Sequence, residues 1–340
     1  MKFRTFSTHS LRTLIASCFL VGMITNASAE VSKVGIAQQY GISYLPLMIM
    51  EENKLLEKEA KEAGLGDIKV NWAKFAGGNV MNDALLSGDL QFASGGLGPF
   101  ITLWAKTKDN IGVKAAAAMN SMPLFLNTRN PDIKSLKDFT DKDKIALPAV
   151  KVSIQAITLQ MAAEKAFGSG QENRLDKFTV TQSHPDGMAA MLSGSSEINS
   201  HFTSPPFQYI ELDKPGIRTI VNSYDVTGGP HTFNVVWASK KFVDANPKTY
   251  AAFLKAFDTS IAIINQDKKA AAEFYVRVSK SKESVESIER MLNDPNIEFT
   301  TTPKNTMKYA EFMNRIGMVK AKPGSWKDMF FPNMHNLPGS

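Results

Sequence analysis

The chain has 340 residues, of which 43% are hydrophobic and 21% are charged, and its formal net charge is +6. This length fits one large domain or two lobes. Three basic residues lie within the first 12 positions, and removing them lowers the net charge from +6 to +3. Because no basic cluster remains, nucleic acid is not expected as a partner.

Residues 1–29 are typical of a secretory leader. Basic residues precede an apolar run over 14–24, which is too short to span a bilayer, and an Ala-Ser-Ala cleavage site ends at Ala29. Cys18 stands in a sequence that looks like a lipoprotein box, but the apolar run continues beyond it. We therefore expect a chain secreted to the periplasm without a lipid anchor.

Metal and cofactor chemistry have little support in the residues. Cys18 is the only cysteine, so the processed chain has no disulfide and no cysteine-ligated metal. The remaining candidate ligands, His184, His201, His231 and His335, never stand at metal-ligand spacing. No metal and no cofactor are expected.

The processed chain alternates strands and helices in the order typical of an α/β fold. Strands are predicted over 33–38, 71–75, 90–93, 111–119, 122–128, 144–147, 177–182, 197–202, 217–221 and 231–239. Helices are predicted over 45–63, 80–87, 152–167, 187–192, from 207, after 247, and over 268–278, 283–292 and 303–318. Small-residue turns are predicted at 76–79 and 94–99, and an aromatic tail with Trp326 and Phe330 is expected to pack on the first lobe.

An internal repeat indicates two similar lobes. Residues 84–88 (ALLSG) match residues 190–194 (AMLSG), and each helix lies between a polar turn and an acidic strand start. We expect each lobe to have a central, mostly parallel sheet flanked by helices, with a cleft between the lobes. Strand ends and helix N-termini would then face the cleft, where the partial positive charge of helix starts attracts anions.

Two strands are predicted to carry the chain between the lobes, at residues 122–128 and 231–239. The resulting division gives the first lobe residues 30–127 and 230–340, and the second lobe residues 128–229.

The chain resembles the solute-binding proteins of ABC importers, in the nitrate, sulfonate and taurine group with the type II periplasmic-binding fold. The resemblance is carried by GISYLP at 41–46, ALLSGDLQF at 84–92, KSLKDF at 134–139 before KIAL at 144–147, and Asn246-Pro247. It implies a periplasmic receptor, not an enzyme, that closes two lobes on a small solute. The implied partners are a membrane permease and its ATPase, and a monomer is expected.

The resemblance also implies which loops contact the solute. The implied contact residues are Gln38, Gln39, Tyr40, Gly77, Gly78, Asn79, Ser94, Gly95, Gly96, Val152, Ser153, Ile154, Thr203, Ser204, His231 and Thr232. At 204–206 the chain has SPP where relatives often have an aromatic-Asp-Pro triplet, which argues against a taurine-like zwitterion.

Each of these residues also has an ordinary structural explanation. Ser153 is suited to be a helix N-cap, Gly77 and Gly78 suit a turn, and His231 suits a buried place beside a hinge. Tyr40 and Tyr44 could stack on a planar solute, but their rings also suit packing at the rim of the lobe. The loops have no arginine, and Lys151 is the only nearby cation. The solute is thus either a sulfonate- or nitrate-like anion held by N–H groups and hydroxyls, or a small aromatic or heterocyclic acid.

Two other functions remain open from the sequence. The same fold serves in making the thiamine pyrimidine, so the chain could be a related binding protein or enzyme, although that relative uses cysteines. No GxSxG elbow, P-loop or HExxH motif is present. A solute sensor for a membrane kinase is the second alternative.

Overall fold

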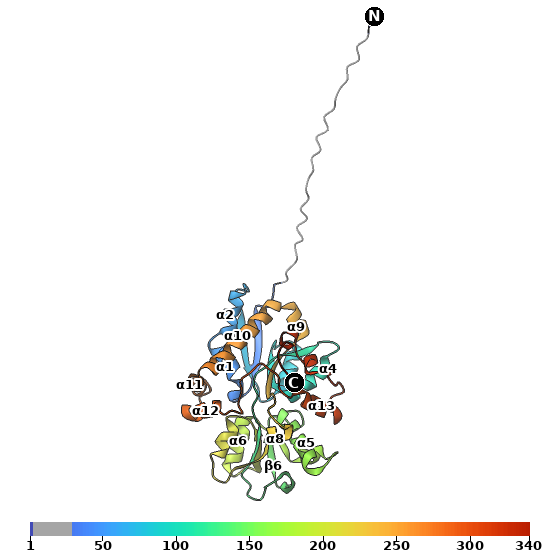
Figure 1. Ribbon diagram of the computed structural model, residues 1–340. Helices are drawn as coiled ribbons and strands as arrows, with labels where there is room; N and C mark the ends of the chain where they lie inside the picture. The colour runs from blue at the N-terminus through green and yellow to red at the C-terminus, as the bar shows by residue number, and fades with distance from the viewer. Residues whose placement is uncertain (3–28) are drawn as a thin grey trace.

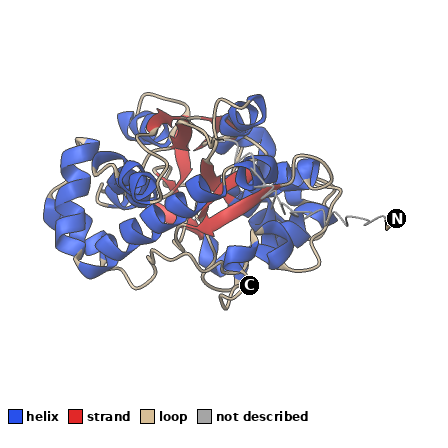
Figure 2. Cartoon of the chain, turned by 90° about the horizontal axis from the view of Figure 1, so that it is seen from above, coloured by secondary structure: helices blue, strands red, loops and turns tan. Residues whose placement is uncertain are grey.

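A computed structural model describes residues 1–2 and 29–340, and the predicted leader with Cys18 lies outside them. Figure 1 shows two lobes, one with α1, α2 and α10 and the other with α5, α6 and β6. Seen from above, strands lie in the centre and helices surround them (Figure 2). The fold is the predicted two-lobed α/β fold.

The first lobe is built on strands β1 to β4 and β10. Their bounds are β1 Lys33–Gln38, β2 Lys69–Lys74, β3 Ala93–Gly96, β4 Val113–Ala118 and β10 Asn234–Ser239. β1 and β2 are parallel, and β10 lies between β3 and β4 and is antiparallel to both. A parallel bridge from Ile36 to Phe92 links the two groups of strands. The resulting order is β2-β1-β3-β10-β4.

The second lobe has a five-stranded sheet with the order β7-β6-β8-β5-β9. Its strands are β5 Phe125–Thr128, β6 Lys144–Leu147, β7 Thr179–Thr181, β8 Ile198–Thr203 and β9 Arg218–Asn222. β6 is parallel to β7 and β8, whereas β5 is antiparallel to β8 and β9. Both sheets therefore have three parallel strands, then one antiparallel strand, then an edge strand, as the internal repeat predicted.

Helices cover the faces of both sheets. The bounds are α1 Leu45–Glu52, α2 Leu55–Glu62, α3 Gly78–Ser87, α4 Leu97–Thr107, α5 Ile154–Phe167, α6 His184–Ser193, α7 Phe207–Leu212, α8 Ser223–Thr227, α9 Lys240–Ala245, α10 Pro247–Gln266, α11 Lys268–Ser279, α12 Val285–Leu292 and α13 Thr306–Arg315. In the part of the chain that is described, no helix combines the length and apolarity needed to cross a bilayer.

The repeated helices α3 and α6 have the same length of 10 residues and the same ending. Gly88 follows α3 with φ 90°, and Gly194 follows α6 with φ 72°. This left-handed conformation is easily reached only by a residue without Cβ, which explains the shared LSG sequence.

Two predicted elements differ from the structure. The single helix expected over 45–63 is two helices, because Lys54 adopts a left-handed φ of 51° between them. The expected turn from Ser94 is instead strand, since Ser94 and Gly96 pair with β10. A long-range pairing partner explains this second difference, and local sequence does not reveal such a partner.

The C-terminal helices and the aromatic tail pack on the first lobe, as predicted. Phe92 stacks on Phe253 of α10 with ring centroids 3.8 Å apart. Phe330 forms a bridge with Ala115 of β4, so the aromatic tail packs on the first lobe. Near the other end, Glu30 accepts hydrogen bonds from the backbone N–H groups of Lys248 and Thr249, at the first turn of α10.

Candidate functional site

Four helix starts from the two lobes meet at one cavity. α3 and α4 reach it from the first lobe, and α5 and α6 reach it from the second. The lining residues are Gln39, Tyr44, Gly78, Gly96, Pro99, Pro148, Ser153, Ile154, Gln155, His184, Phe233 and Asn234. This arrangement follows from the shared sheet order, which points the same ends of both sheets at each other.

The lobes touch closely around this cavity. A Cβ atom added at Gly96 would lie 2.5 Å from Cγ2 of Ile154 in the other lobe, and one at Gly98 would overlap the carbonyl oxygen of Val152. The space open to the centre of a water molecule is about 20 Å³, a little more than one water needs. The structure is therefore a closed form with a small cavity.

The helix starts of the two lobes differ in their capping. Gly77 and Gly96 are the N-cap residues of α3 and α4, and neither has a side chain to cap the helix. In the second lobe, Ser153 accepts from the N–H of Ala156, and Ser183 caps α6 in the same way. The first lobe therefore keeps bare N–H groups at the cavity, which suit a ligand with hydrogen-bond acceptors.

Asn234 has an unusual environment for a buried amide. It is fully buried on the cavity wall. The Tyr44 phenol is its neighbour, and burial raises the pKa of that phenol, yet neither amide atom of Asn234 makes a hydrogen bond of good geometry with a protein group. An unpaired buried polar group costs free energy. The Asn234 amide is thus available to a solute, as both donor and acceptor.

His184 is the titratable side chain that the second lobe brings to the cavity. Its Nε2 lies 3.3 Å from Nε2 of Gln155, and its Nδ1 lies 2.9 Å from Oγ1 of Thr203. Burial, and to a smaller extent the neighbouring His201, lowers the pKa of His184 well below its ordinary 6.5. At neutral pH the imidazole is therefore uncharged.

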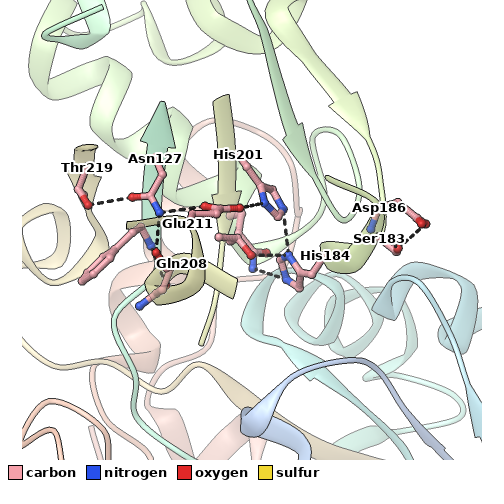
Figure 3. Close-up of polar contacts among 11 residues, drawn as sticks. Asn127, Ser183, His184, Asp186, His201, Gln208, Glu211 and Thr219 are labelled. Atoms are coloured by element: carbon pink, nitrogen blue, oxygen red, sulfur yellow. Dashed lines mark hydrogen bonds and ion pairs between the residues drawn. The ribbon is translucent and has the colours of Figure 1, made fainter. Parts of the chain in front are cut away.

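Behind His184 a chain of polar contacts runs into the second lobe (Figure 3). His184 Nδ1 lies 3.3 Å from His201 Nε2, and His201 Nδ1 lies 2.6 Å from Glu211 Oε1. The other Glu211 oxygen accepts from Asn127, whose own oxygen accepts from Thr219. His201, Glu211 and Asn127 are fully buried.

The cavity wall has no lysine, arginine, aspartate or glutamate among the described residues. Lys151, the nearby cation noted in the sequence, is exposed at φ 64° and lies by a different surface depression with Asp176. Helix starts, amides and one histidine therefore determine the electrostatics of the cavity.

Comparison with known proteins identifies the family of this chain. A model described as the NMT1-like family matches residues 27–278. The chain belongs to the NMT1-like family. No protein with a curated description matches the sequence.

Solved structures with the same fold include periplasmic binding proteins. The alkanesulfonate-binding protein of Xanthomonas axonopodis pv. citri bound to MOPS has a TM-score of 0.67 at 16% identity, over 86% of this chain and 96% of that one. The periplasmic nitrate-binding protein of Synechocystis has a TM-score of 0.67 at 16% identity, over 88% of this chain and 84% of that one. The periplasmic aliphatic sulphonate-binding protein of Escherichia coli has a TM-score of 0.63 at 18% identity, over 89% of this chain and 92% of that one. At these identities they establish the periplasmic-binding fold and leave the solute open.

The structure of this NMT1-like chain brings part of the predicted contact set to the cavity wall. The predicted residues that line it are Gln39, Gly78, Gly96, Ser153 and Ile154. The others, which do not line it, are Gln38, Tyr40, Gly77, Asn79, Ser94, Gly95, Val152, Thr203, Ser204, His231 and Thr232. Their role in binding stays a prediction.

Several of these residues are occupied elsewhere. Ser94 donates to the carbonyl of Ala37, and Thr203 contacts His184. His231 lies beside the return to the first lobe, where its ring nitrogens contact Ser223 Oγ and the carbonyl of Thr232. This is the buried, satisfied histidine that the sequence offered as the alternative to a ligand contact.

Sequence reasoning did not assign some lining residues to the site. These are Pro99, Pro148, Gln155, His184, Phe233 and Asn234, whereas Tyr44, which also lines the cavity, was considered for stacking on a planar solute. His184 had a usable signal, because it stands in a polar turn after a strand, like the first Gly-rich turn. Asn234 had none, since it looks like an ordinary residue of a strand.

Proposed function

We propose that this protein is the solute-binding component of an ABC-type import system, and that it captures a small solute between its two lobes. The proposed solute is a sulfonate- or nitrate-like anion or a small aromatic or heterocyclic acid. The fold of the NMT1-like chain and the named neighbours support this proposal.

One observation carries the proposal most directly. The buried amide of Asn234 lies on the wall of a cavity that both lobes build, next to the Tyr44 phenol but with no hydrogen bond of full geometry to either of its polar atoms. Such a poorly bonded amide is costly in a protein that only needs to fold. A solute that pairs with it, and with the bare helix starts of α3 and α4, would recover that free energy when the lobes close.

The remaining parts of the proposal follow from this role. The first lobe would comprise residues 30–124 and 230–340, and the second residues 125–229, hinged at the two crossing segments. The predicted division at 127/128 moves to this position because β5 lies in the second sheet. The processed chain would act in the periplasm as a monomer that binds without catalysis, and it would pass its solute to a permease and ATPase complex.

Native mass spectrometry of protein purified without denaturation tests the proposal. We expect a retained small molecule, and its mass would define the solute class. Calorimetry with nitrate, alkanesulfonates, aromatic acids and pyrimidines then measures affinity, and small-angle scattering measures lobe closure.

A matched pair of variants makes the test specific. Asn234→Leu keeps the side-chain size but removes the amide, and we expect at least a tenfold weaker affinity. Asn293→Leu, exposed at the end of α12, should bind like wild type. A folded protein that retains no molecule and binds no member of the panel would contradict the receptor function.

A further inference from the structure

The cleft lacks a permanent cation, and this poses a problem for an acidic solute. Burying an anion with no opposite charge costs several kcal/mol. Bare N–H groups and hydroxyls reduce this cost but supply no net charge. Among the described residues on the wall, His184 is the side chain that can become positive by taking a proton near neutral pH.

The groups around His184 come from three elements of the second lobe. Gln155 belongs to α5, Thr203 and His201 to β8, and Phe207 to α7. The Tyr44 phenol of the first lobe lines the same cavity. Of the four residues of the second lobe, His201 alone is titratable, and Glu211 stands directly behind it. On α6 itself, Asp186 is exposed and bonded to Ser183.

A buried pair of polar side chains stands behind His184. Glu211 and His201 are both fully buried, and His201 Nδ1 lies 2.6 Å from Glu211 Oε1. Asn127 donates to the second carboxylate oxygen and keeps Glu211 in place.

We propose that the cleft takes up an acidic solute together with one proton from solvent, and that His184 on the cavity wall holds this proton next to the anion. The inference rests on the proposed function and adds the charge of the solute and the way it is neutralised. His184 is the contact residue, and His201 and Glu211 are positioning residues.

The charges balance in both forms. In the free protein at neutral pH, His184 is uncharged, and the described residues of the cavity wall include no lysine, arginine, aspartate or glutamate. In the bound form, protonated His184 and the anionic solute cancel each other. Thr203 and Gln155 suit both forms, because a hydroxyl can rotate and an amide has both donor and acceptor atoms.

Proton uptake has a measurable sign. A nearby anion favours the charged imidazole, so the pKa of His184 rises on binding. A site that gains one proton binds more weakly as pH rises, by up to about tenfold per pH unit between the free and bound pKa values. The dissociation constant should therefore increase from pH 6.5 to pH 8.

Calorimetry with nitrate and ethanesulfonate as probes tests the inference, because both stay singly charged across this pH range. Titration at pH 7.5 in phosphate and in Tris buffers gives the number of protons exchanged. For wild type we expect uptake of about one proton per anion. His184→Gln should bind more weakly with no proton uptake and no pH dependence, and Glu211→Gln should reduce the uptake.

His335→Gln provides the matched control, because His335 lies in the C-terminal tail and should leave the proton count unchanged. Nitrogen-15 NMR of the histidine rings gives a second measurement. The His184 ring should be neutral in the free protein at pH 7 and protonated with the probe bound, which a merely structural histidine would not show.

Each result decides between the two proposals. Binding without proton uptake, or unchanged uptake in His184→Gln, overturns the inference. Binding of uracil but of neither anion overturns it as well, yet leaves the receptor function standing. A protein that binds no solute of any kind contradicts the receptor function itself.

Discussion

The two lobes share a sheet order but bring different chemistry to the cavity between them. The first lobe contributes glycines and helix starts without side-chain caps, at α3 and α4. The second contributes serine-capped helix starts and the polar side chains of Gln155 and His184. The same framework thus supplies uncapped helix starts and the Asn234 amide on one side, and capped helix starts with a titratable imidazole on the other.

This difference shows what the repeat controls and what it does not. Strand order places the helix starts, because it is a property of the whole sheet. Capping decides whether the first N–H groups remain free, and a single residue before each helix sets it. Identical topology is therefore compatible with two unlike halves of one site.

The largest expected effect comes from Gly98→Ala in the first lobe. The new Cβ would overlap the Val152 carbonyl and crowd Ile157 across the cleft, so the lobes could not close. We expect solute affinity to fall at least about 100-fold, near 3 kcal/mol. The free energy of unfolding measured with urea should stay the same or increase, since alanine favours helices more than glycine does.

Gly324→Ala, in the tail, is the control for this substitution. Wild-type affinity in Gly98→Ala would mean that backbone approach from the first lobe is not needed, and the contrast between the lobes would lose its meaning for binding.

The second effect concerns His231 at the hinge, a residue that lies outside the capping difference between the two lobes. Burial lowers the pKa of His231 from its ordinary 6.5 to about 4. On acidification the unfolded chain gains this proton first, so stability is present above pH 6.5 and lost as pH falls toward 4. The loss should be about 2 kcal/mol between pH 7 and pH 5.

Urea unfolding at pH 7 and at pH 5 measures this loss of stability. The His231→Gln variant should be less stable than wild type at pH 7, but its free energy of unfolding should fall less between pH 7 and pH 5. An equally steep loss in the variant would assign the acid sensitivity to other groups, with His184 the first candidate.

The third effect addresses capping itself. Ser153→Ala and Ser183→Ala remove the side-chain caps of the second lobe. Each should lower the free energy of unfolding by about 1 kcal/mol. Thermal melts measure this, and Ser195→Ala in an exposed turn should change little. If neither cap matters, the two lobes differ less than their geometry indicates.

The smallest effect is expected for the ion pair between Arg315 of α13 and Glu164 of α5. The pair is bidentate, at 2.6 and 2.7 Å, but Arg315 is 53% exposed. Arg315→Gln should cost about 0.5 kcal/mol and less in high salt. A loss above 2 kcal/mol would show that this contact, and not the cavity, holds the lobes together.

Sequence reasoning predicted the features that depend on neighbouring residues. The bounds of β6, the cap at Ser153 and the left-handed glycines after α3 and α6 all follow from local patterns. The pairing of Ser94 with β10 does not, because its partner strand lies far along the chain. The break at Lys54, an exposed residue, is not marked by the local pattern either. Asn234 became a candidate site residue only when the lobes met, whereas the polar turn at His184 offered a signal.

The position of β10 has a consequence for how the protein is made. It lies in the middle of the first sheet, yet it leaves the ribosome after every strand of the second sheet. The strands of the second sheet, β5 to β9, follow one another in the chain, whereas the first sheet is complete only with residues 234–239. We therefore expect a fragment over residues 121–230 to fold alone, and a fragment that ends before residue 234 to leave the first sheet incomplete.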